Sequence, residues 1–176
     1  MAQVKDYLDD ARSLERAAFV ARYPDACLIP KSAEEGGDPR REYSSTLKME
    51  INPKTREVRI APMPPAPTDA VILLKKSDRS DFAGKILIGR TETNDVVLSH
   101  LTVSKHHAYF RWEADGACSL TDTESTNGTR INGVVLGSRK SRAVYDGDEV
   151  AFGDMKFTFY SAGGFYDLLR SLSAIR

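Results

Sequence analysis

Short apolar runs separated by turn-forming residues dominate the second half of the chain. Turn signals such as Asp146-Gly147 and Gly153-Asp154 punctuate these runs at nearly regular spacing. Many short strands with such punctuation are typical of a β-sandwich. The pattern therefore predicts an all-β fold with two packed antiparallel sheets. The expected strands are residues 71–74, 86–88, 95–98, 108–112, 118–121, 134–136, 149–152 and 156–160.

The amino-terminal stretch has a helical period instead. Its apolar positions recur every three or four residues, at Val4, Leu8, Ala11, Leu14 and Ala18. This spacing predicts one amphipathic helix over residues 4–21, ended by Pro24. We expect its apolar face to pack on the body of the same molecule, with docking on another chain as the alternative.

A hairpin pattern follows the helix. Leu47, Met49 and Ile51 alternate with charged residues, as do Val58 and Ile60, around a turn at residues 52–55. A lone hairpin is not stable in water. We therefore expect the helix, a short apolar run at residues 26–29 and these strands to form one amino-terminal appendage over residues 1–61.

Prolines cluster next to this appendage. Pro62, Pro64, Pro65 and Pro67 cannot continue a sheet ladder, which predicts a linker over residues 62–69. The β-sandwich is then expected over residues 70–176. A short amphipathic helix closes it after Gly163-Gly164, where Phe165, Leu168, Leu169 and Leu172 recur at helical spacing.

Composition narrows the classes of function. Lys and Arg number 25, as do Asp and Glu, so the 176-residue chain has a formal net charge of zero and a pI of about 6.8. A general nucleic-acid binder would be basic. Because there is no apolar stretch of membrane-spanning length, we expect a cytoplasmic protein without membrane contact. Cys27 and Cys118 are expected to be reduced core residues, and neither a metal site nor a cofactor is expected.

Several ordered motifs between residues 71 and 160 then carry a resemblance. They are Gly89-Arg90, Ser104 with His107, Asp122, Ser125-Thr126-Asn127-Gly128-Thr129, Asn132-Gly133, residues 146–150 and Phe152-Gly153. Together they resemble the signature of the forkhead-associated domain, a phosphothreonine-binding β-sandwich. The amino-terminal 61 residues have no part in this resemblance.

The resemblance implies a set of phosphopeptide contacts. Arg90 matches the phosphate-binding arginine, Ser104 the hydroxyl donor and Thr126 a second residue beside the phosphate. Asn127 matches the asparagine that holds the peptide backbone. Lys105 stands where the family often has arginine or asparagine, and it is expected either to assist phosphate binding as a point charge or to be a solvated loop lysine.

The same resemblance implies a structural set. His107 matches a histidine that braces the recognition loops, and Gly89, Gly128, Asn132 and Gly133 are expected to support the loops and turns. A methyl-sized pocket would favour phosphothreonine over phosphoserine. The implied partner is a phosphothreonine-containing protein, either a Ser/Thr kinase or its substrate.

Two other classes of function stay open from the residues. Ser104, His107 and Asp122 could form a hydrolase triad, although no nucleophile elbow surrounds the serine. The sandwich could also be a phosphate-independent assembly module that binds through the amino-terminal appendage. A regulatory variant of the main hypothesis would place a phosphate on one of three nearby threonines, Thr46, Thr55 or Thr68.

Overall fold

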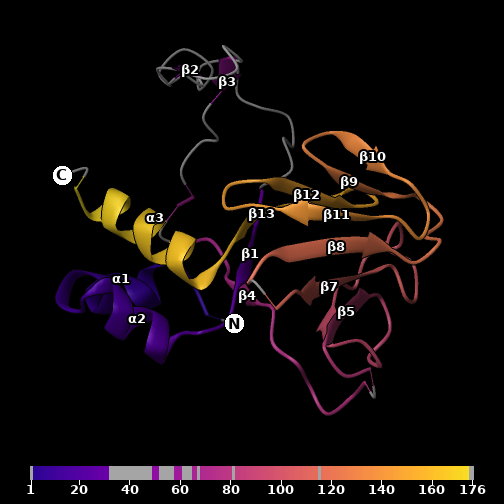
Figure 1. Ribbon diagram of the computed structural model, residues 1–176, viewed down its shortest axis with the longest axis horizontal. Coiled ribbons are helices and arrows are strands. Elements are labelled where there is room, and N and C mark those ends of the chain that lie inside the picture. Colours follow the sequence, from indigo (N-terminus) through magenta and orange to yellow (C-terminus); the bar gives the residue numbers. More distant parts are fainter. Residues whose placement is uncertain are drawn as a thin grey trace.

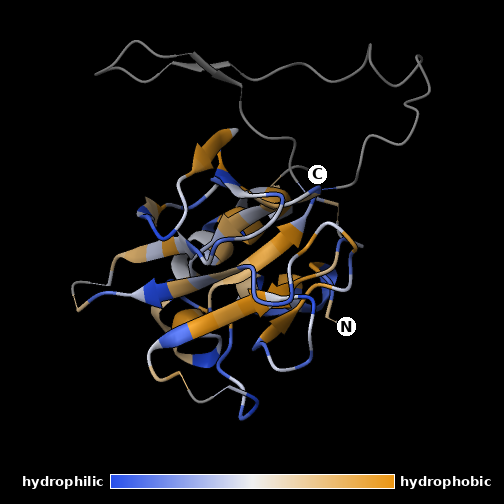
Figure 2. Ribbon diagram, turned by 90° about the vertical axis from the view of Figure 1, so that its right-hand side faces the viewer, coloured by the Kyte–Doolittle hydropathy of each residue, from blue (hydrophilic) through white to orange (hydrophobic). Residues whose placement is uncertain are grey.

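The computed structural model describes residues 2–31, 49–51, 58–60, 65–66, 68–80, 82–114 and 116–174. Two β-sheets face each other (Figure 1). They enclose an apolar core, to which both contribute buried side chains such as Leu28, Ile88, Phe110 and Phe152. The strands are mainly apolar and the connecting loops mainly hydrophilic (Figure 2). The predicted β-sandwich is confirmed.

The first sheet has six strands in the order β10-β9-β12-β13-β1-β4. All of its neighbouring strands pair antiparallel. Their bounds are β1 Cys27–Pro30, β4 Ile72–Leu73, β9 Thr129–Ile131, β10 Val134–Leu136, β12 Glu149–Phe152 and β13 Met155–Tyr160.

The second sheet has five strands in the order β11-β8-β7-β5-β6. Its β5–β6 pair is parallel, so the expectation of purely antiparallel sheets is wrong at this edge. The bounds are β5 Lys85–Gly89, β6 Val96–Val97, β7 Ala108–Trp112, β8 Cys118–Asp122 and β11 Ser141–Val144.

Two strands of the sandwich have no counterpart in the sequence prediction. Strand β9 is three residues long and lies between two Asn-Gly pairs, so turn signals obscure it. Strand β11 reads Ser-Arg-Ala-Val at the edge of its sheet and has only one buried residue, Val144. Neither shows the apolar alternation on which a strand is recognised from sequence.

Strand β1 belongs to the sandwich and not to a separate amino-terminal unit. It pairs with β13 on one side and with β4 on the other, and Leu28 is fully buried in the core between the sheets. The expectation that this run joins the helix and hairpin in one subdomain is therefore wrong for β1. The wider division into 1–61, 62–69 and 70–176 stays a prediction.

The amino-terminal segment forms two helices instead of one, α1 (Lys5–Ser13) and α2 (Arg16–Arg22). Extended backbone at Leu14 and Glu15 separates them. The carboxy-terminal helix, α3 (Ala162–Ala174), is longer than predicted because it includes both glycines of the Gly163-Gly164 pair. Figure 1 shows the three helices grouped beside β1 and β13.

A second apolar cluster joins these helices to the sheet. It contains Tyr7, Phe19 and Phe165 from the helices and Cys27 and Ile29 from the outward face of β1. The amphipathic helices therefore pack on the body of the same molecule, as predicted. Their packing also explains why β1 is buried on both of its faces.

The predicted hairpin is present as β2 (Met49–Ile51) paired antiparallel with β3 (Val58–Ile60). Its expected turn at residues 52–55, Leu47 and most of the proline cluster lie outside the described residues.

Cys27 and Cys118 are buried free thiols, as predicted, and burial raises the pKa of Cys118 to about 12. Within the described ranges, no helix is long and apolar enough to span a bilayer.

Leucine substitutions in the adjacent strands β1 and β4 test whether β1 is part of the sandwich core. Leu28→Ala is expected to lower the free energy of unfolding by about 2–5 kcal/mol, because it opens a cavity in the main core. The control is Leu73→Ala in β4, where the side chain is 37% exposed and the expected change is below about 1 kcal/mol. Urea unfolding measures both. Equal, small losses would show that β1 does not contribute to the core.

Candidate functional site

Three loops meet at one end of the five-stranded sheet and form a pocket of about 300 Å³. They are the loop after β5, the loop between β6 and β7, and the loop between β8 and β9. The pocket lining combines two cations, three hydroxyl residues and two apolar residues. These are Arg90 and Lys105; Thr102, Ser104 and Thr126; and Leu101 and Val103.

The structure brings four of the five expected contact residues to this pocket. Arg90, Ser104, Lys105 and Thr126 all line it. Asn127 is outside the lining; it lies next to Thr126, and its side-chain Nδ2 donates to the carbonyl oxygen of Thr102 at 2.8 Å. The site predicted from sequence is thus a single locus with Asn127 beside it.

Positive charge is available at the pocket. The side chains of Arg90 and Lys105 are exposed, and among the described residues neither has a salt bridge. The lining contains no Asp or Glu. An unpaired cationic pocket of this kind can receive a dianionic oxyanion without first breaking an ion pair.

A direct hydrogen bond joins the two loops that carry the hydroxyls. The backbone N–H of Thr126 donates to Ser104 Oγ at 2.9 Å. The Ser104 hydroxyl in turn makes a longer contact of 3.4 Å with Thr126 Oγ1. At that length the bond is weak, so the Ser104 proton can turn to a better acceptor such as a phosphate oxygen.

His107 braces the same two loops from inside. Its Nδ1 accepts the backbone N–H of Ser104 at 3.0 Å, and its Nε2 lies 3.2 Å from the carbonyl oxygen of Gly128. A carbonyl only accepts, so Nε2 must carry the proton and the ring is neutral. The imidazole is fully buried and meets Phe152 edge to face.

This arrangement contradicts the hydrolase alternative. Ser104 meets His107 through its backbone N–H, and its Oγ accepts from Thr126, so the imidazole is not placed to take the serine proton. Asp122 is directed to Ser125 and Thr129 instead of to the imidazole.

Asp122 shapes the loop that presents Thr126 and Asn127. Its carboxylate accepts the backbone N–H of Ser125 at 3.0 Å and the hydroxyls of Ser125 and Thr129, both at 2.6 Å. Burial by itself would raise the pKa of Asp122, but the hydrogen bonds from Ser125 and Thr129 outweigh it and leave the pKa below its usual value. The charged form therefore holds this loop at neutral pH.

Gly89 is required because the pocket loop passes directly over it. A Cβ at this position would lie 2.2 Å from the carbonyl oxygen of Lys105. The close approach lets the backbone N–H of Arg90 donate to the carbonyl oxygen of Ser104 at 2.9 Å. The support expected from Gly89 is thus a steric one.

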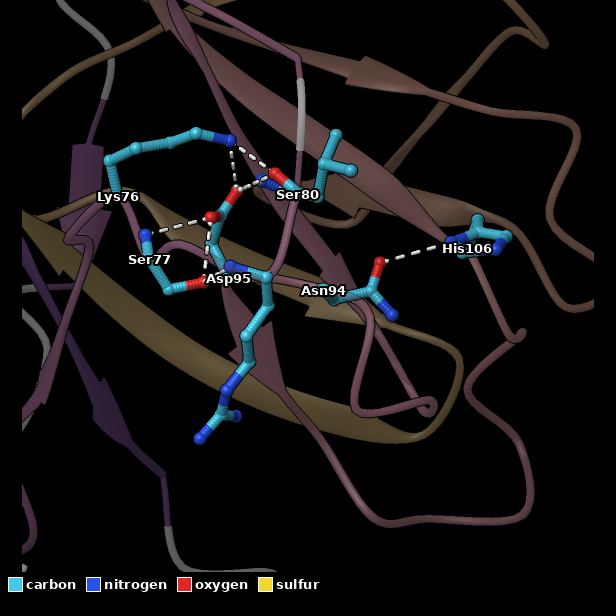
Figure 3. A network of polar contacts seen from close by, with 8 residues as sticks. Lys76, Ser77, Ser80, Asn94, Asp95 and His106 are labelled. Carbon is cyan, nitrogen blue, oxygen red and sulfur yellow. Dashed lines mark hydrogen bonds and ion pairs between the residues drawn. The ribbon is translucent and has the colours of Figure 1, made fainter.

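Asn94 and Asp95, just before β6, hydrogen-bond to two different loops, the pocket loop at Lys105 and the loop at residues 76–80. Neither role was predicted from the sequence. Buried Asn94 donates from Nδ2 to the carbonyl oxygen of Lys105 at 2.7 Å, and its Oδ1 contacts His106 Nδ1 at 3.2 Å. Figure 3 shows Asp95 among Lys76, Ser77 and Ser80 on the other side. An Asn-Asp pair in a sequence usually indicates a turn. That these two side chains hold neighbouring loops is evident only from their burial in the structure.

The Asp95 carboxylate has no exposed surface. Burial would raise its pKa, but hydrogen bonds from the backbone N–H groups of Leu87 and Ser77, with further bonds from Lys76 and Ser80, lower it overall. Asp95 is therefore the charged anchor of residues 76–80.

The Asn132-Gly133 pair forms the turn between β9 and β10, as predicted. Both residues have positive φ, 51° and 77°, and Asn132 Nδ2 donates to Asp148 Oδ1 at 2.7 Å. The pair stabilises the hairpin but does not line the pocket.

In the part of the chain that the structure describes, no group of three or more His, Cys, Asp or Glu side chains could hold a metal ion.

The buried imidazole makes stability depend on pH. Burial lowers the pKa of His107 below its ordinary value of 6.5, although the Gly128 hydrogen bond opposes this. As pH falls below about 6.5, the unfolded chain therefore takes up the proton before the folded chain does, and the free energy of unfolding decreases by up to about 1.4 kcal/mol per pH unit. The loss levels off below the pKa of the folded state.

Urea unfolding between pH 8 and pH 5 measures this effect. The His107→Gln variant should be less stable at pH 8 but should lose the decrease below pH 6.5. Asp95 and Asp122 also have lowered pKa values, but they titrate at lower pH and do not interfere. The same slope in both proteins would show that another group controls the pH dependence.

Curated relatives match the pocket-bearing part of the chain. The oxoglutarate dehydrogenase inhibitor of Corynebacterium diphtheriae is 38% identical over 71 residues, which are 40% of this chain and 47% of the relative. The glycogen accumulation regulator GarA of Mycolicibacterium smegmatis is 37% identical over 71 residues, which are 40% of this chain and 42% of the relative. The chain thus spans less than half the length of these relatives.

Two further comparisons concern the same part of the chain. A solved structure from work on phosphothreonine-dependent FHA domain interactions is 26% identical, with a TM-score of 0.42, and covers 51% of this chain and 82% of that one. The family model for the FHA domain matches residues 86–153, from the second residue of β5 to the turn after β12. The matched stretch contains every residue of the pocket. The chain therefore carries a forkhead-associated (FHA) domain over residues 86–153.

Proposed function

We propose that this chain is a phosphothreonine-dependent adaptor of Ser/Thr kinase signalling, without catalytic activity of its own. The observation that supports it best is the convergence of Arg90, Ser104, Lys105 and Thr126 on one pocket that has no acidic lining. The FHA family match over the same residues adds to this support. The ligand would be a phosphorylated segment of another protein.

The chemistry of the pocket suits a phosphate monoester. Such a group has about −1.5 to −2 charges at pH 7 and several strong acceptor oxygens. Arg90 offers a planar fork of donors for two of these oxygens, whereas Lys105 adds a point charge. Ser104 donates a third, charge-assisted bond. Phosphate binding thus needs no group beyond those already at the pocket.

Apolar residues at the pocket supply a reason for threonine. Val103 lines the pocket and is only 1% exposed, and Leu101 next to it is 87% exposed. Leu101 offers an exposed apolar surface for the methyl group that distinguishes phosphothreonine from phosphoserine, and the buried Val103 supports this loop from the core. Burying one methyl group contributes roughly 1–3 kcal/mol of discrimination.

The partner class follows from the ligand. A phosphothreonine in a Ser/Thr kinase or in its substrate would bind, and the protein would act in the cytoplasm. Both curated relatives described above have the names of regulators, an inhibitor and a glycogen accumulation regulator. A phosphate on Thr46, Thr55 or Thr68 remains a regulatory hypothesis; Thr68 is exposed, and the other two lie outside the described residues.

The phosphate-independent assembly module is less well supported. That hypothesis needs an apolar face of the amino-terminal segment for an external partner. The buried faces of α1 and α2 are already covered, because Tyr7 and Phe19 pack on Phe165 of α3. An assembly module would also retain its partner after phosphatase treatment, which separates the two hypotheses.

Substitutions in the pocket test the site assignment. Arg90→Ala and Ser104→Ala should each weaken binding of a phosphothreonine peptide, because a lost charge-assisted bond costs roughly 1.5–3 kcal/mol. Isothermal titration calorimetry with a peptide selected from a phosphothreonine library measures the Kd. Arg142→Ala and Ser119→Ala, on strands outside the pocket, are matched controls that should leave the Kd unchanged. Normal affinity in both pocket variants would refute the assignment.

The proposed preference for the methyl group of phosphothreonine can be tested separately. The phosphothreonine form of the selected peptide should bind about tenfold or more tightly than its phosphoserine form. Leu101→Ala should reduce this ratio, because it removes the exposed apolar side chain at the pocket. Equal Kd values for the two peptides with the natural protein would contradict a role of the methyl group.

A further inference from the structure

Thr102 is bonded on three sides, although none of the sequence motifs includes it. Its carbonyl oxygen accepts Asn127 Nδ2 at 2.8 Å. Its Oγ1 accepts the backbone N–H of Asp154 at 3.0 Å and also lies 2.8 Å from His100 Nδ1. Thr102 therefore joins the pocket loop to the turn between β12 and β13 and to the loop that carries Asn127.

The bond to Asn127 fixes the orientation of its amide. A backbone carbonyl can only accept, so the NH₂ group of Asn127 must face Thr102. The side-chain Oδ1 is then directed away from Thr102 as an available acceptor. An exposed asparagine without such a partner would sample both orientations of its amide.

The Thr102 carbonyl itself is held by close packing. A Cβ on Gly153 would lie 2.5 Å from that oxygen, so only glycine leaves room for it. The N–H of Gly153 also donates to the carbonyl oxygen of Gly128 at 3.1 Å, next to Asn127. The β12–β13 turn thus fixes both partners of the Thr102–Asn127 bond.

We propose that Thr102 is a positioning residue, which holds the Asn127 amide with Oδ1 turned to accept a backbone N–H of the bound peptide. This inference rests on the proposed function for the identity of the ligand. The orientation of the amide is a property of the free protein. A preorganised amide does not have to be ordered during binding, so affinity increases without a new contact.

Nuclear magnetic resonance of the free protein tests the positioning directly. One of the two Asn127 side-chain NH₂ proton signals should exchange slowly with water, because that proton is bonded to the Thr102 carbonyl oxygen. Thr102→Val keeps the size of the side chain but removes Oγ1, so the loop loses its bond to Asp154 and the Asn127 signals should shift and exchange faster. Thr102→Ser should restore them.

Gly153→Ala is the second variant, because its Cβ would lie 2.5 Å from the Thr102 carbonyl oxygen and 2.7 Å from Thr102 Oγ1 and would displace both. It should change the Asn127 signals in the same way. Thr93→Val is the matched control, since Thr93 is exposed, contacts Thr91 and does not line the pocket. Unchanged Asn127 signals in both Thr102→Val and Gly153→Ala would overturn the proposal.

Peptide binding gives the functional readout. Thr102→Val should raise the Kd for the phosphothreonine peptide about tenfold, the size expected for one oriented hydrogen bond. In the Asn127→Ala background the same substitution should have little effect, because Thr102 acts through Asn127. A full tenfold loss in that background would overturn the proposal. No binding by the natural protein would instead refute the proposed function and leave the amide result intact.

Discussion

The arrangement of the site depends on one buried, neutral imidazole. His107 accepts from Ser104 and donates to Gly128, so a single ring fixes the distance between the two loops that line the pocket. Burial lowers the pKa of His107 and so keeps the ring neutral at neutral pH, and the two backbone partners select the tautomer with the proton on Nε2. Because the ring is committed to the backbone, it is a scaffold and not a base.

The pocket is thus assembled by the backbone more than by its own side chains. Gly89 lets the Lys105 carbonyl approach to within the reach of Asn94, and Asp122 shapes the loop that ends at Thr129. Arg90 and Lys105 are left exposed and free to meet an anion. The buried polar groups behind them set the geometry through bonds made within the protein.

Much of this could be predicted from the sequence, for physical reasons. Apolar runs with turn pairs indicate a sandwich whatever its exact topology. The motif between Gly89 and Gly133, through its resemblance to the FHA signature, identifies four of the seven residues that line the pocket. The alternation rule fails for β11 because a polar edge strand has only Val144 to bury. It also fails for β1, where four apolar or small residues show neither which sheet they enter nor that helices cover their outer face.

The roles of Asn94, Asp95 and Thr102 could not be predicted, because they depend on contacts between loops that are 11 to 25 residues apart in sequence. The central claim is that the pocket binds a phosphorylated threonine. Titration of the ¹⁵N-labelled protein with a phosphothreonine peptide, followed by nuclear magnetic resonance, tests it most directly. The account predicts saturable shifts confined to Arg90, residues 101–105 and residues 126–127, and none with the unphosphorylated peptide. Equal shifts with both peptides, or shifts only elsewhere on the sandwich, would contradict it.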